Sequence, residues 1–486
     1  MGFLKKRYLI STIILSTIFT GCGSSNTSSN SDKNDSNTEN SIIVQTPSDY
    51  AKRSNNNYNE NTYGLVSPKY VASLVTDWQK NKPAGKRNLF IMQYGNIYGF
   101  TGTHKEPISA TEMIDMGNGY IKSNPSQNVF VYDRTSGCTT TGDSRGDGVS
   151  SVPKPVFTIE QMDQAFATYG IDPDQDVLVL LLGSPDQSKA GNYMAGVARM
   201  WYTLTYWGFP QESILMLNGQ ASNVLNPEIN SDISEMGITK DQIFTQLPSA
   251  YRAKPEWKSI RETKVDGTIL QATMKDVMNV VDAKSASDLI LDARSEKEYL
   301  GAKKAKTEYK VCGATGDKQC YTAFDGHIKG AKSLYFLNVL NHEDGKEDIN
   351  KDTKIDYKDS SFSFKSLSEL DTLFKDVGYK SGSHVYTYCR TGTKASLLTF
   401  TSSAVLGYNT RIYDGSWIQW GKLANVNDFN GTELVPANNK WLTDVYSESV
   451  TYNSDSSTIG PLNRTELNLD AKDTDAIIKE DKLAKN

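Results

Sequence analysis

The chain has 486 residues, of which 38% are hydrophobic and 22% charged, and its formal net charge is −5. This length suits two or three globular domains. The mild negative charge argues against nucleic acid as the main partner, because proteins that bind nucleic acid usually carry a basic excess. Five cysteines are too few for a disulfide scaffold.

The N-terminal residues predict export. Three basic residues (5–7) precede a short apolar segment (8–19) that cannot span a bilayer. The segment leads into Cys22, which resembles a bacterial lipobox. We expect a lipoprotein signal peptide over residues 1–21 and a lipid on Cys22 that anchors the chain to a membrane of the cell envelope. The alternative is an ordinary secretory signal followed by a chance cysteine. Gly23, rather than Asp, resembles the outer-membrane sorting pattern of a Gram-negative cell.

The first half predicts alternating helices and strands. Residues 22–60 begin with a Ser- and Asn-rich stretch, and we expect them to form a flexible tether. The elements expected next are a helix capped by Ser67 and reaching about Lys80, a strand at 88–92, a helix opened by Thr158 and Gln161, a buried strand at 177–182, a helix at 193–207 and a strand at 214–217. This alternation indicates a layered α/β domain over residues 61–235.

The second half repeats this order of elements. Its expected elements are a helix opened by Thr273 and Asp276, a strand at 289–292, a helix opened by Ser366 and Glu369, a strand at 384–388 and a helix at 395–406. The repetition predicts two homologous domains, 61–235 and 262–425. Each is expected to be a parallel sheet flanked by helices.

A short polar loop stands between the strand at 384–388 and the last helix. Its residues are Cys389, Arg390, Thr391, Gly392, Thr393 and Lys394. The backbone N–H groups and the helix dipole favour an anion there. A cysteine at the mouth of this loop should ionise to a nucleophilic thiolate. The alternative is a buried, inert thiol. A cysteine phosphatase is excluded because Ala395 stands where that class needs an arginine.

This loop and the downstream segment 413–420 resemble the rhodanese (sulfurtransferase) family, in particular the two-domain thiosulfate and 3-mercaptopyruvate sulfurtransferases. The resemblance covers Leu65 to about Leu423. It implies two tandem rhodanese-like domains and a persulfide on Cys389. It implies no cofactor. The expected partners are a small-molecule sulfur donor and a thiol acceptor.

The resemblance also assigns supporting roles. Asp292 matches an Asp that orders the active-site region, and we expect Arg294 to be a structural ion-pair partner. Trp417 would lie near the pocket, or else simply in the core. Glu298 stands where the family has an arginine that holds the anion, and a carboxylate facing the pocket would repel thiosulfate. Lys394 also departs from the usual Thr or Arg.

The remaining cysteines leave alternatives open. The loop of the first half, residues 183–192, has no cysteine, so that half is expected to be catalytically silent and to cover the cleft. Cys138 is an incidental or buried thiol, or a second sulfur site. Cys312 and Cys320 form a disulfide that pins an insertion, or a resolving pair that exchanges with the Cys389 persulfide.

Other polar segments predict no metal site. His327 lies in a Gly-His-Ile motif and is expected to hydrogen-bond nearby backbone rather than act as a base. The four histidines have no ligand spacing, so no zinc site is indicated. The acidic stretch 341–359 is read as a solvated insertion, with calcium binding as the alternative. Residues 426–486 form a C-terminal extension, expected to be mobile past about Ser454.

The function predicted from these features is sulfur transfer by double displacement. The Cys389 thiolate takes a sulfane sulfur from an anionic donor, thiosulfate or 3-mercaptopyruvate, and a thiol or cyanide removes it. Arg390, Lys394 and the backbone N–H groups of residues 391–394 hold the negative charge. The alternative is a non-enzymatic sulfur or selenium carrier, or an accessory lipoprotein that partners an envelope redox complex.

Overall fold

The computed structural model describes most of the chain after residue 41. The described residues are 42–94, 120–134, 144–148, 151–152, 155–183, 190–245, 256–284, 287–300, 326–342, 360–424, 443–444 and 474–485. All of them belong to one compact unit, residues 41–486. The predictions for the signal peptide, Cys22, Cys138, Cys312, Cys320 and most of the acidic insertion lie outside the described residues.

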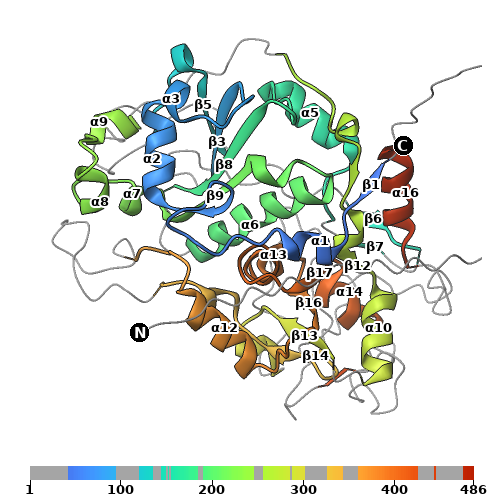
Figure 1. Ribbon diagram of the computed structural model, residues 1–486. Helices are drawn as coiled ribbons and strands as arrows, with labels where there is room; N and C mark the ends of the chain where they lie inside the picture. The colour runs from blue at the N-terminus through green and yellow to red at the C-terminus, as the bar shows by residue number, and fades with distance from the viewer. Residues whose placement is uncertain are drawn as a thin grey trace, which may run out of the picture. The chain divides into compact units, whose positions relative to one another are not determined.

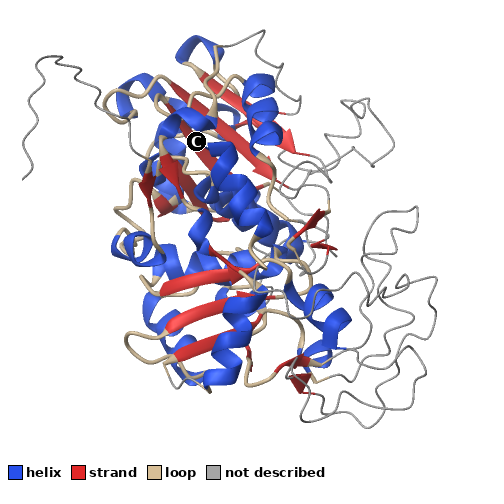
Figure 2. Cartoon of the chain, turned by 90° about the vertical axis from the view of Figure 1, so that its right-hand side faces the viewer, coloured by secondary structure: helices blue, strands red, loops and turns tan. Residues whose placement is uncertain are grey.

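The first half contains a five-stranded sheet in which every neighbouring pair is parallel (Figure 2). Its strands, in spatial order, are β2 (Gly64–Val66), β9 (Ile214–Gln220), β8 (Asp176–Leu182), β3 (Asn88–Tyr94) and β5 (Val129–Arg134). The helices of this half are α2 (Pro68–Thr76), α3 (Trp78–Asn81), α5 (Ile159–Tyr169), α6 (Ala190–Tyr206), α7 (Ala221–Val224), α8 (Ser231–Ser234) and α9 (Lys240–Ile243).

The central strand β8 explains why this sheet is covered on both faces. Every residue from Asp176 to Leu182 is buried. Successive side chains of a strand point to opposite faces. Val177, Val179 and Leu181 therefore pack in the cluster that contains α2, whereas the residues between them pack in the cluster that contains α5 and α6. The predicted buried strand is confirmed.

Side-chain caps set several helix boundaries. The capping box of Thr158 and Gln161 opens α5, and Ser67 caps α2, so both predicted starts are confirmed. The helix from Ser67 does not continue to Lys80, however. It stops at Asp77, whose backbone leaves the helical region and whose side chain caps the short helix α3.

The second half contains another five-stranded parallel sheet. In spatial order its strands are β12 (Gln271–Ala272), β17 (Asn409–Tyr413), β16 (His384–Tyr388), β13 (Asp288–Asp292) and β15 (Lys332–Ser333). Its helices are α10 (Met274–Ala283), α11 (Glu296–Tyr299), α12 (Leu367–Asp376), α13 (Thr393–Phe400) and α14 (Ser416–Ala424). When the five strands of each sheet are numbered by their order along the chain, both sheets have the same spatial order, 1-5-4-2-3. The fourth strand, β8 in the first sheet and β16 in the second, is central in each.

The helices that follow the two central strands pack on each other. Figure 1 shows α6 and α13 side by side between the sheets. Trp201 of α6 meets Phe400 of α13 edge to face, with ring centroids 5.1 Å apart. Both rings belong to a hydrophobic cluster that continues from one half into the other. The two sheets therefore share one core.

Two segments pack more firmly than predicted. The expected tether through residue 60 contains β1 (Ile43–Val44), which pairs with β11 (Val265–Asp266), and α1 (Pro47–Lys52). Tyr50 of α1 is buried, and its hydroxyl donates to the Thr205 carbonyl. The prediction of a tether is wrong for this part because β1 pairs through its backbone and because Pro47 and Tyr50 of α1 are buried.

The other corrected segment is α16 (Ala476–Lys485), in the region predicted to be mobile. Ile477 is buried, and so is the Lys485 side chain. The Lys485 ammonium nitrogen lies 2.8 Å from the Trp207 carbonyl oxygen and 2.7 Å from Thr263 Oγ1. The prediction of mobility is wrong for these residues. Their charge pattern alone did not reveal that the helix packs against the rest of the protein.

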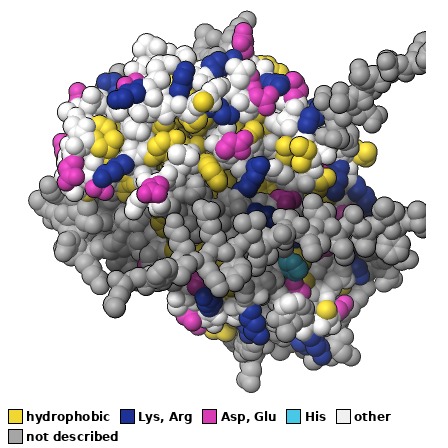
Figure 3. Space-filling view, in the orientation of Figure 1, with side chains coloured by type: hydrophobic (Ala, Val, Ile, Leu, Met, Phe, Trp, Pro, Cys, Tyr) yellow, Lys and Arg dark blue, Asp and Glu magenta, His cyan; other side chains and the backbone are white. Residues whose placement is uncertain are grey.

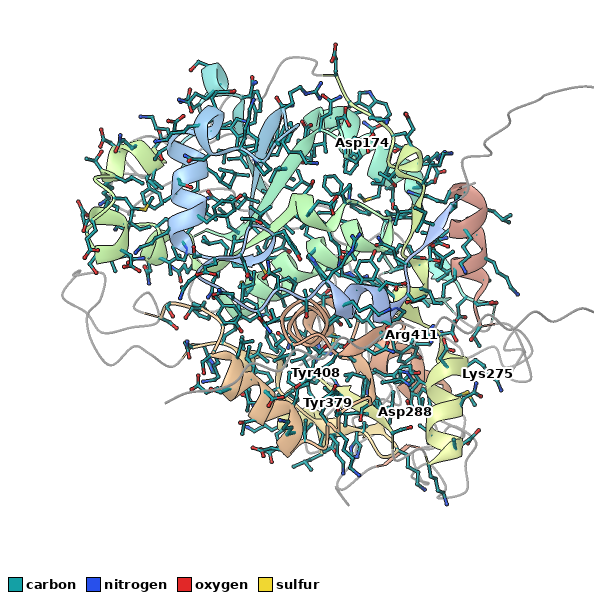
Figure 4. The ribbon with its side chains drawn as sticks, in the orientation of Figure 1. Asp174, Lys275, Asp288, Tyr379, Tyr408 and Arg411 are labelled. Atoms are coloured by element: carbon teal, nitrogen blue, oxygen red, sulfur yellow. The ribbon has the colours of Figure 1, made fainter. Side chains whose placement is uncertain are left out.

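Side chains of both charges are mixed on the surface. Figure 3 shows Lys and Arg side chains interspersed with Asp and Glu on the face it draws. In Figure 4, Arg411 lies on β17, beside helix α10; it donates to the Asp276 carboxylate at 2.9 Å.

None of the described helices combines the length and apolar character needed to cross a membrane. The smaller strands are β4 (Tyr120–Ile121), β6 (Arg145–Gly146), β7 (Ser151–Val152), β10 (Phe244–Thr245), β14 (His327–Ile328) and β18 (Thr443–Asp444).

Candidate functional site

The predicted cysteine loop lies at the carboxyl end of the central strand β16. Ligands of open parallel sheets commonly bind at this edge. The strand covers His384–Tyr388, as predicted, and α13 begins at Thr393. The loop proper is therefore Cys389–Gly392, and Thr393 and Lys394 belong to the first helical turn. The N–H groups of that turn are the ones that an α-helix leaves without intrahelical partners.

The following segment holds the loop backbone in place. The Cys389 N–H donates to Ser416 Oγ at 3.3 Å, and the Cys389 carbonyl accepts from the Trp417 N–H at 3.0 Å. The Arg390 carbonyl accepts from the Ile418 N–H at 3.1 Å. Ser416 has a φ of +53°, which is unusual for a residue other than glycine. Ser416 was not predicted to hold the loop, because its contact with Cys389 depends on the tertiary structure.

Cys389 is a free thiol at the base of the loop. Only 1% of the residue is exposed, and it belongs to the shared hydrophobic cluster. The expectation of a cysteine at the mouth of the loop is wrong, because the side chain turns toward the core below the sheet edge. In this structure the Cys389 side chain is closed to solvent.

The Asp292–Arg294 pair lies next to the loop. Asp292 is fully buried at the end of β13, opposite Tyr388 in the register. Its carboxylate accepts from the Arg294 backbone N–H at 3.0 Å and from its Nη2 at 2.6 Å. The Arg294 guanidinium lies 4.6 Å from the Trp417 ring centre. In this structure Trp417 is fully buried and supports the loop through its backbone and this stacking contact.

Glu298 forms an ion pair with Arg390, the first cation of the loop. Its other carboxylate oxygen accepts from the Ser295 N–H and hydroxyl, in the capping box of α11. Burial alone would raise the pKa of Glu298. The positive charges of Arg390, Arg294 and Lys394 outweigh burial and lower the pKa to about 2. Glu298 is therefore a carboxylate at neutral pH, in contact with a residue predicted to hold the donor.

A further ion pair comes from the first half. Arg199 of α6 and Asp414 are both fully buried and meet in a two-pronged pair, with Nη2 donating to Oδ2 at 2.8 Å. Burial alone would lower the pKa of Arg199, but the charge of Asp414 and the hydrogen bonds to it raise the pKa. Arg199 was not predicted to belong to the site. The available signal was an arginine in an otherwise apolar helix, which needs a buried carboxylate.

Gly392 lets this pair approach the loop. Its φ is +84°, a conformation that favours glycine. A Cβ atom placed on Gly392 would lie 2.8 Å from Arg199 Nη1 and would also collide with the Asp414 carboxylate. The backbone of the loop thus passes directly over the Arg199–Asp414 pair.

The other predicted loop residues lie partly open. Thr391, Thr393 and Lys394 are half-buried. The Lys394 ammonium lies 5.1 Å from the centre of the Phe336 ring, within the range of a cation–π contact.

His327 has the structural role that was predicted for it. It is buried, its Nδ1 lies 2.8 Å from the Tyr299 carbonyl oxygen, and its ring stacks on Tyr299 with centroids 3.7 Å apart. Across the described part of the chain, no group of three or more His, Cys, Asp or Glu side chains could hold a metal ion.

The comparisons with known proteins match one family model to the second half and find relatives named for sulfur transfer or sulfur carriage. Residues 273–423 match the model of the rhodanese-like domain. The chain is 27% identical over 275 residues to a Haloferax volcanii protein named "Putative thiosulfate sulfurtransferase", a match covering 56% of this chain and 74% of that protein. It is 29% identical over 166 residues to the sulfur carrier protein TtuD of Thermus thermophilus, covering 34% of this chain and 49% of TtuD.

Solved structures resemble the chain more weakly. The Tum1 protein of Saccharomyces cerevisiae superposes with a TM-score of 0.45 at 17% identity, covering 75% of this chain and 97% of Tum1.

Proposed function

We propose, from the premise that residues 273–423 are a rhodanese-like domain, that the chain is a sulfurtransferase working through a persulfide on Cys389. The observation that carries the proposal is the position of Cys389. It follows the central parallel strand directly and precedes a left-handed glycine and a helix N-terminus. The relatives named as thiosulfate sulfurtransferases support the same reaction class.

The proposed reaction has two displacements. The Cys389 thiolate attacks the outer sulfur of the donor. With thiosulfate, the S–S bond of the donor breaks, a new S–S bond forms on Cys389 and sulfite leaves. With 3-mercaptopyruvate, the C–S bond breaks, the thiol proton goes to carbon and pyruvate leaves. A thiol or cyanide then takes the terminal sulfur, as a persulfide or thiocyanate, and restores the thiolate.

In this proposal the loop stabilises negative charge. The backbone N–H groups of residues 391–394 and the Lys394 ammonium lie at the start of α13, where the helix dipole favours an anion. Arg390 supplies its charge while bound to Glu298. Asp292 and Trp417 keep the loop in place through Arg294 and the Cys389 carbonyl.

We also propose that the two sheets are tandem rhodanese-like domains and that the first is catalytically silent. The shared strand order supports a common origin. The first domain has no cysteine after β8. Its contribution to the site is Arg199, which supports the loop from below. For export, we propose that a signal peptide over residues 1–21 is removed and that Cys22 is lipidated, which incorporation of labelled palmitate would test.

A second candidate is a sulfur carrier, which holds the persulfide for a protein partner instead of turning over small molecules. The similarity to the sulfur carrier protein TtuD favours it. Steady-state assays separate the two candidates: repeated turnover with a small donor and cyanide identifies the enzyme, whereas a single stable loading identifies the carrier.

The test of the proposed function is mass spectrometry of the purified chain after donor treatment. We expect Cys389 to gain one sulfur atom, and we expect cyanide to remove it as thiocyanate. The Cys389→Ser variant should gain no sulfur at this position and should lose essentially all turnover. Full turnover by Cys389→Ser, or no loading of Cys389 by any donor, would falsify the proposal.

A further inference from the structure

We infer that Tyr335 is a specificity-determining residue whose ring binds the leaving group of the sulfur donor and favours donors that carry a planar apolar group. This inference rests on the proposed sulfur transfer through Cys389. It adds a side chain from outside the cysteine loop and names a donor class, organic thiosulfonates with an aromatic substituent.

Tyr335 lies at the same sheet edge as the cysteine loop. The N–H groups on either side of it, those of Leu334 and Phe336, donate at 3.0 and 3.2 Å to two carbonyl oxygens at the carboxyl end of β13. The strand β13 is the direct neighbour of β16, whose last residue precedes Cys389. The backbone of Tyr335 is therefore fixed one strand away from the proposed nucleophile.

The Tyr335 side chain lies near both cationic residues of the loop. Its ring meets the Phe336 ring edge to face, with centroids 4.9 Å apart. The Lys394 ammonium lies 5.1 Å from the centre of the same Phe336 ring. The Tyr335 hydroxyl is also within range of the charge of Glu298, the carboxylate that pairs with Arg390. The ring is thus placed beside the two cations that are proposed to hold the donor.

Tyr335 keeps accessible surface at this place. It is half-buried, whereas Leu334 and Phe336 are both buried. The loop residues Thr391 and Thr393 are half-buried as well. An accessible aromatic ring offers a contact to a second planar apolar group, in an offset or edge-to-face arrangement. A donor that reaches the loop therefore meets an aromatic surface next to the cations.

This surface carries no charge that would repel an anionic donor. Burial raises the pKa of Tyr335 above its usual value, and the Glu298 carboxylate adds to this effect. The phenol is therefore neutral at neutral pH. A donor can consequently place its negative oxygens near the cations of the loop and its apolar substituent against the ring.

Benzenethiosulfonate and methanethiosulfonate form a matched pair of probes. Both are monoanions with the same reacting S–S bond, and they differ only in a phenyl or a methyl substituent. In each reaction the Cys389 thiolate bonds to the outer sulfur of the donor and the S–S bond of the donor breaks. Benzenesulfinate or methanesulfinate leaves with the electron pair of that bond, so atoms and charge balance.

The experiment compares kcat/KM for the two probes in the wild type, Tyr335→Leu and Tyr335→Phe. Leucine removes the aromatic ring. We expect the ratio of benzenethiosulfonate to methanethiosulfonate to fall about fivefold in Tyr335→Leu, the usual effect of one aromatic pair. The change should lie mainly in KM, because the ring contacts the substituent before and during the reaction. Phenylalanine keeps the ring, so Tyr335→Phe should retain the ratio of the wild type.

Tyr379→Leu is the control variant. Tyr379 is half-buried too, and its ring stacks on that of Tyr408 with centroids 3.6 Å apart. The two residues precede β16 and β17 and therefore lie toward the edge of the sheet opposite the cysteine loop (Figure 4). Removing this ring should leave the ratio of the two probes unchanged.

A measurement on the wild type covers a variant that does not fold. Benzenesulfonate should inhibit persulfide formation at about fivefold lower concentration than methanesulfonate, because it makes the same contact with the ring. An unchanged ratio in folded Tyr335→Leu, an equal fall in Tyr335→Phe or Tyr379→Leu, or equal inhibition by the two sulfonates would overturn the inference. Absence of sulfur on Cys389 with both probes would instead contradict the proposed function.

Discussion

At the scale of single residues, buried charges organise the loop. Arg199 and Asp414 are fully buried and come from different halves of the chain. Replacing such a pair by well-packed apolar residues is often neutral, but removing one member leaves an uncompensated charge inside the protein. Because Gly392 lies against both residues, the pair connects the stability of the protein to the position of the cysteine loop.

This pair leads to a stability prediction. The Arg199→Met variant should lower the free energy of unfolding by about 3–5 kcal/mol, because Asp414 is then buried without a cation. The double variant Arg199→Met/Asp414→Asn should recover a large part of that loss. Urea denaturation of the single and double variants gives both values.

Lys240→Met is the control for this experiment. It breaks the exposed Lys240–Glu228 pair, and its expected cost is at most about 1 kcal/mol. Equal losses in Arg199→Met and Lys240→Met would show that the buried pair is not an organising contact.

The residues of the loop were accessible to sequence reasoning, whereas their partners were not. Cys389 was identified from the polar residues that follow it directly. Arg199 is separated from Asp414 by 215 positions, and nothing local in α6 names its partner. Glu298 was recognised as a departure from the family pattern, but its contact with Arg390 requires the fold.

At the scale of elements, the strand β16, the loop and the helix α13 act as one unit. The turn between them is short because Gly392 adopts a left-handed conformation that directs the chain into the helix. The loop then fits closely over the Arg199–Asp414 pair, with no space for a side chain at that position.

A glycine substitution tests this fit. Gly392→Ala should lower stability by roughly 2–4 kcal/mol, since the methyl group adds a collision to the conformational cost. Gly382→Ala is the matched control, because Gly382 has nearly the same φ (+85°) with nothing within 4 Å of its Cβ position. Its cost should be about 1 kcal/mol. Thermal unfolding compares the two, and equal shifts in Tm would contradict the proposed fit.

The elements that sequence predicts well are those with strong local signals. The capping boxes of Thr158, Thr273 and Ser366 begin three helices as expected. The two-residue strands β12 and β15 have no periodicity to detect and exist only because longer strands pair with them. The loop was predicted two residues too long because helix propensity does not distinguish Thr393 from a loop residue.

At the scale of the whole molecule, α16 connects distant parts of the described chain. Asp481 accepts from Arg145 at 2.7 Å and from the Tyr206 hydroxyl at 2.7 Å. Lys485 reaches the carbonyl of Trp207, at the end of α6, and Thr263 near the start of the second half. The helix therefore stabilises the region where the two halves meet.

Burial lowers the pKa of Lys485 to about 7, and the nearby carboxylates of Asp266 and Asp163 counteract only part of this effect. Between pH 7 and 10 the unfolded chain thus binds more protons at this site than the folded chain. The free energy of unfolding contributed by Lys485 should rise with pH in this range, by up to about 1.4 kcal/mol per pH unit.

The variant Lys485→Met isolates this contribution. Urea denaturation of the wild type and the variant at pH 7, 8 and 9 should show a difference that changes in favour of the wild type as the pH increases. A difference that stays constant, or that changes in the opposite direction, would mean that Lys485 remains an ammonium ion, held by the carbonyl oxygens of Trp207 and Ile260 and by Thr263 Oγ1.

The buried Arg199–Asp414 pair between the two halves also restricts how the sequence can diverge. A mutation at position 199 leaves a buried carboxylate, and a mutation at position 414 leaves a buried guanidinium, so neither position drifts independently. Under the proposed function, selection for the chemistry of the cysteine loop therefore extends to the first sheet, whose helix α6 supplies Arg199. A half proposed to perform no reaction is in this way tied to the half proposed to carry the nucleophile.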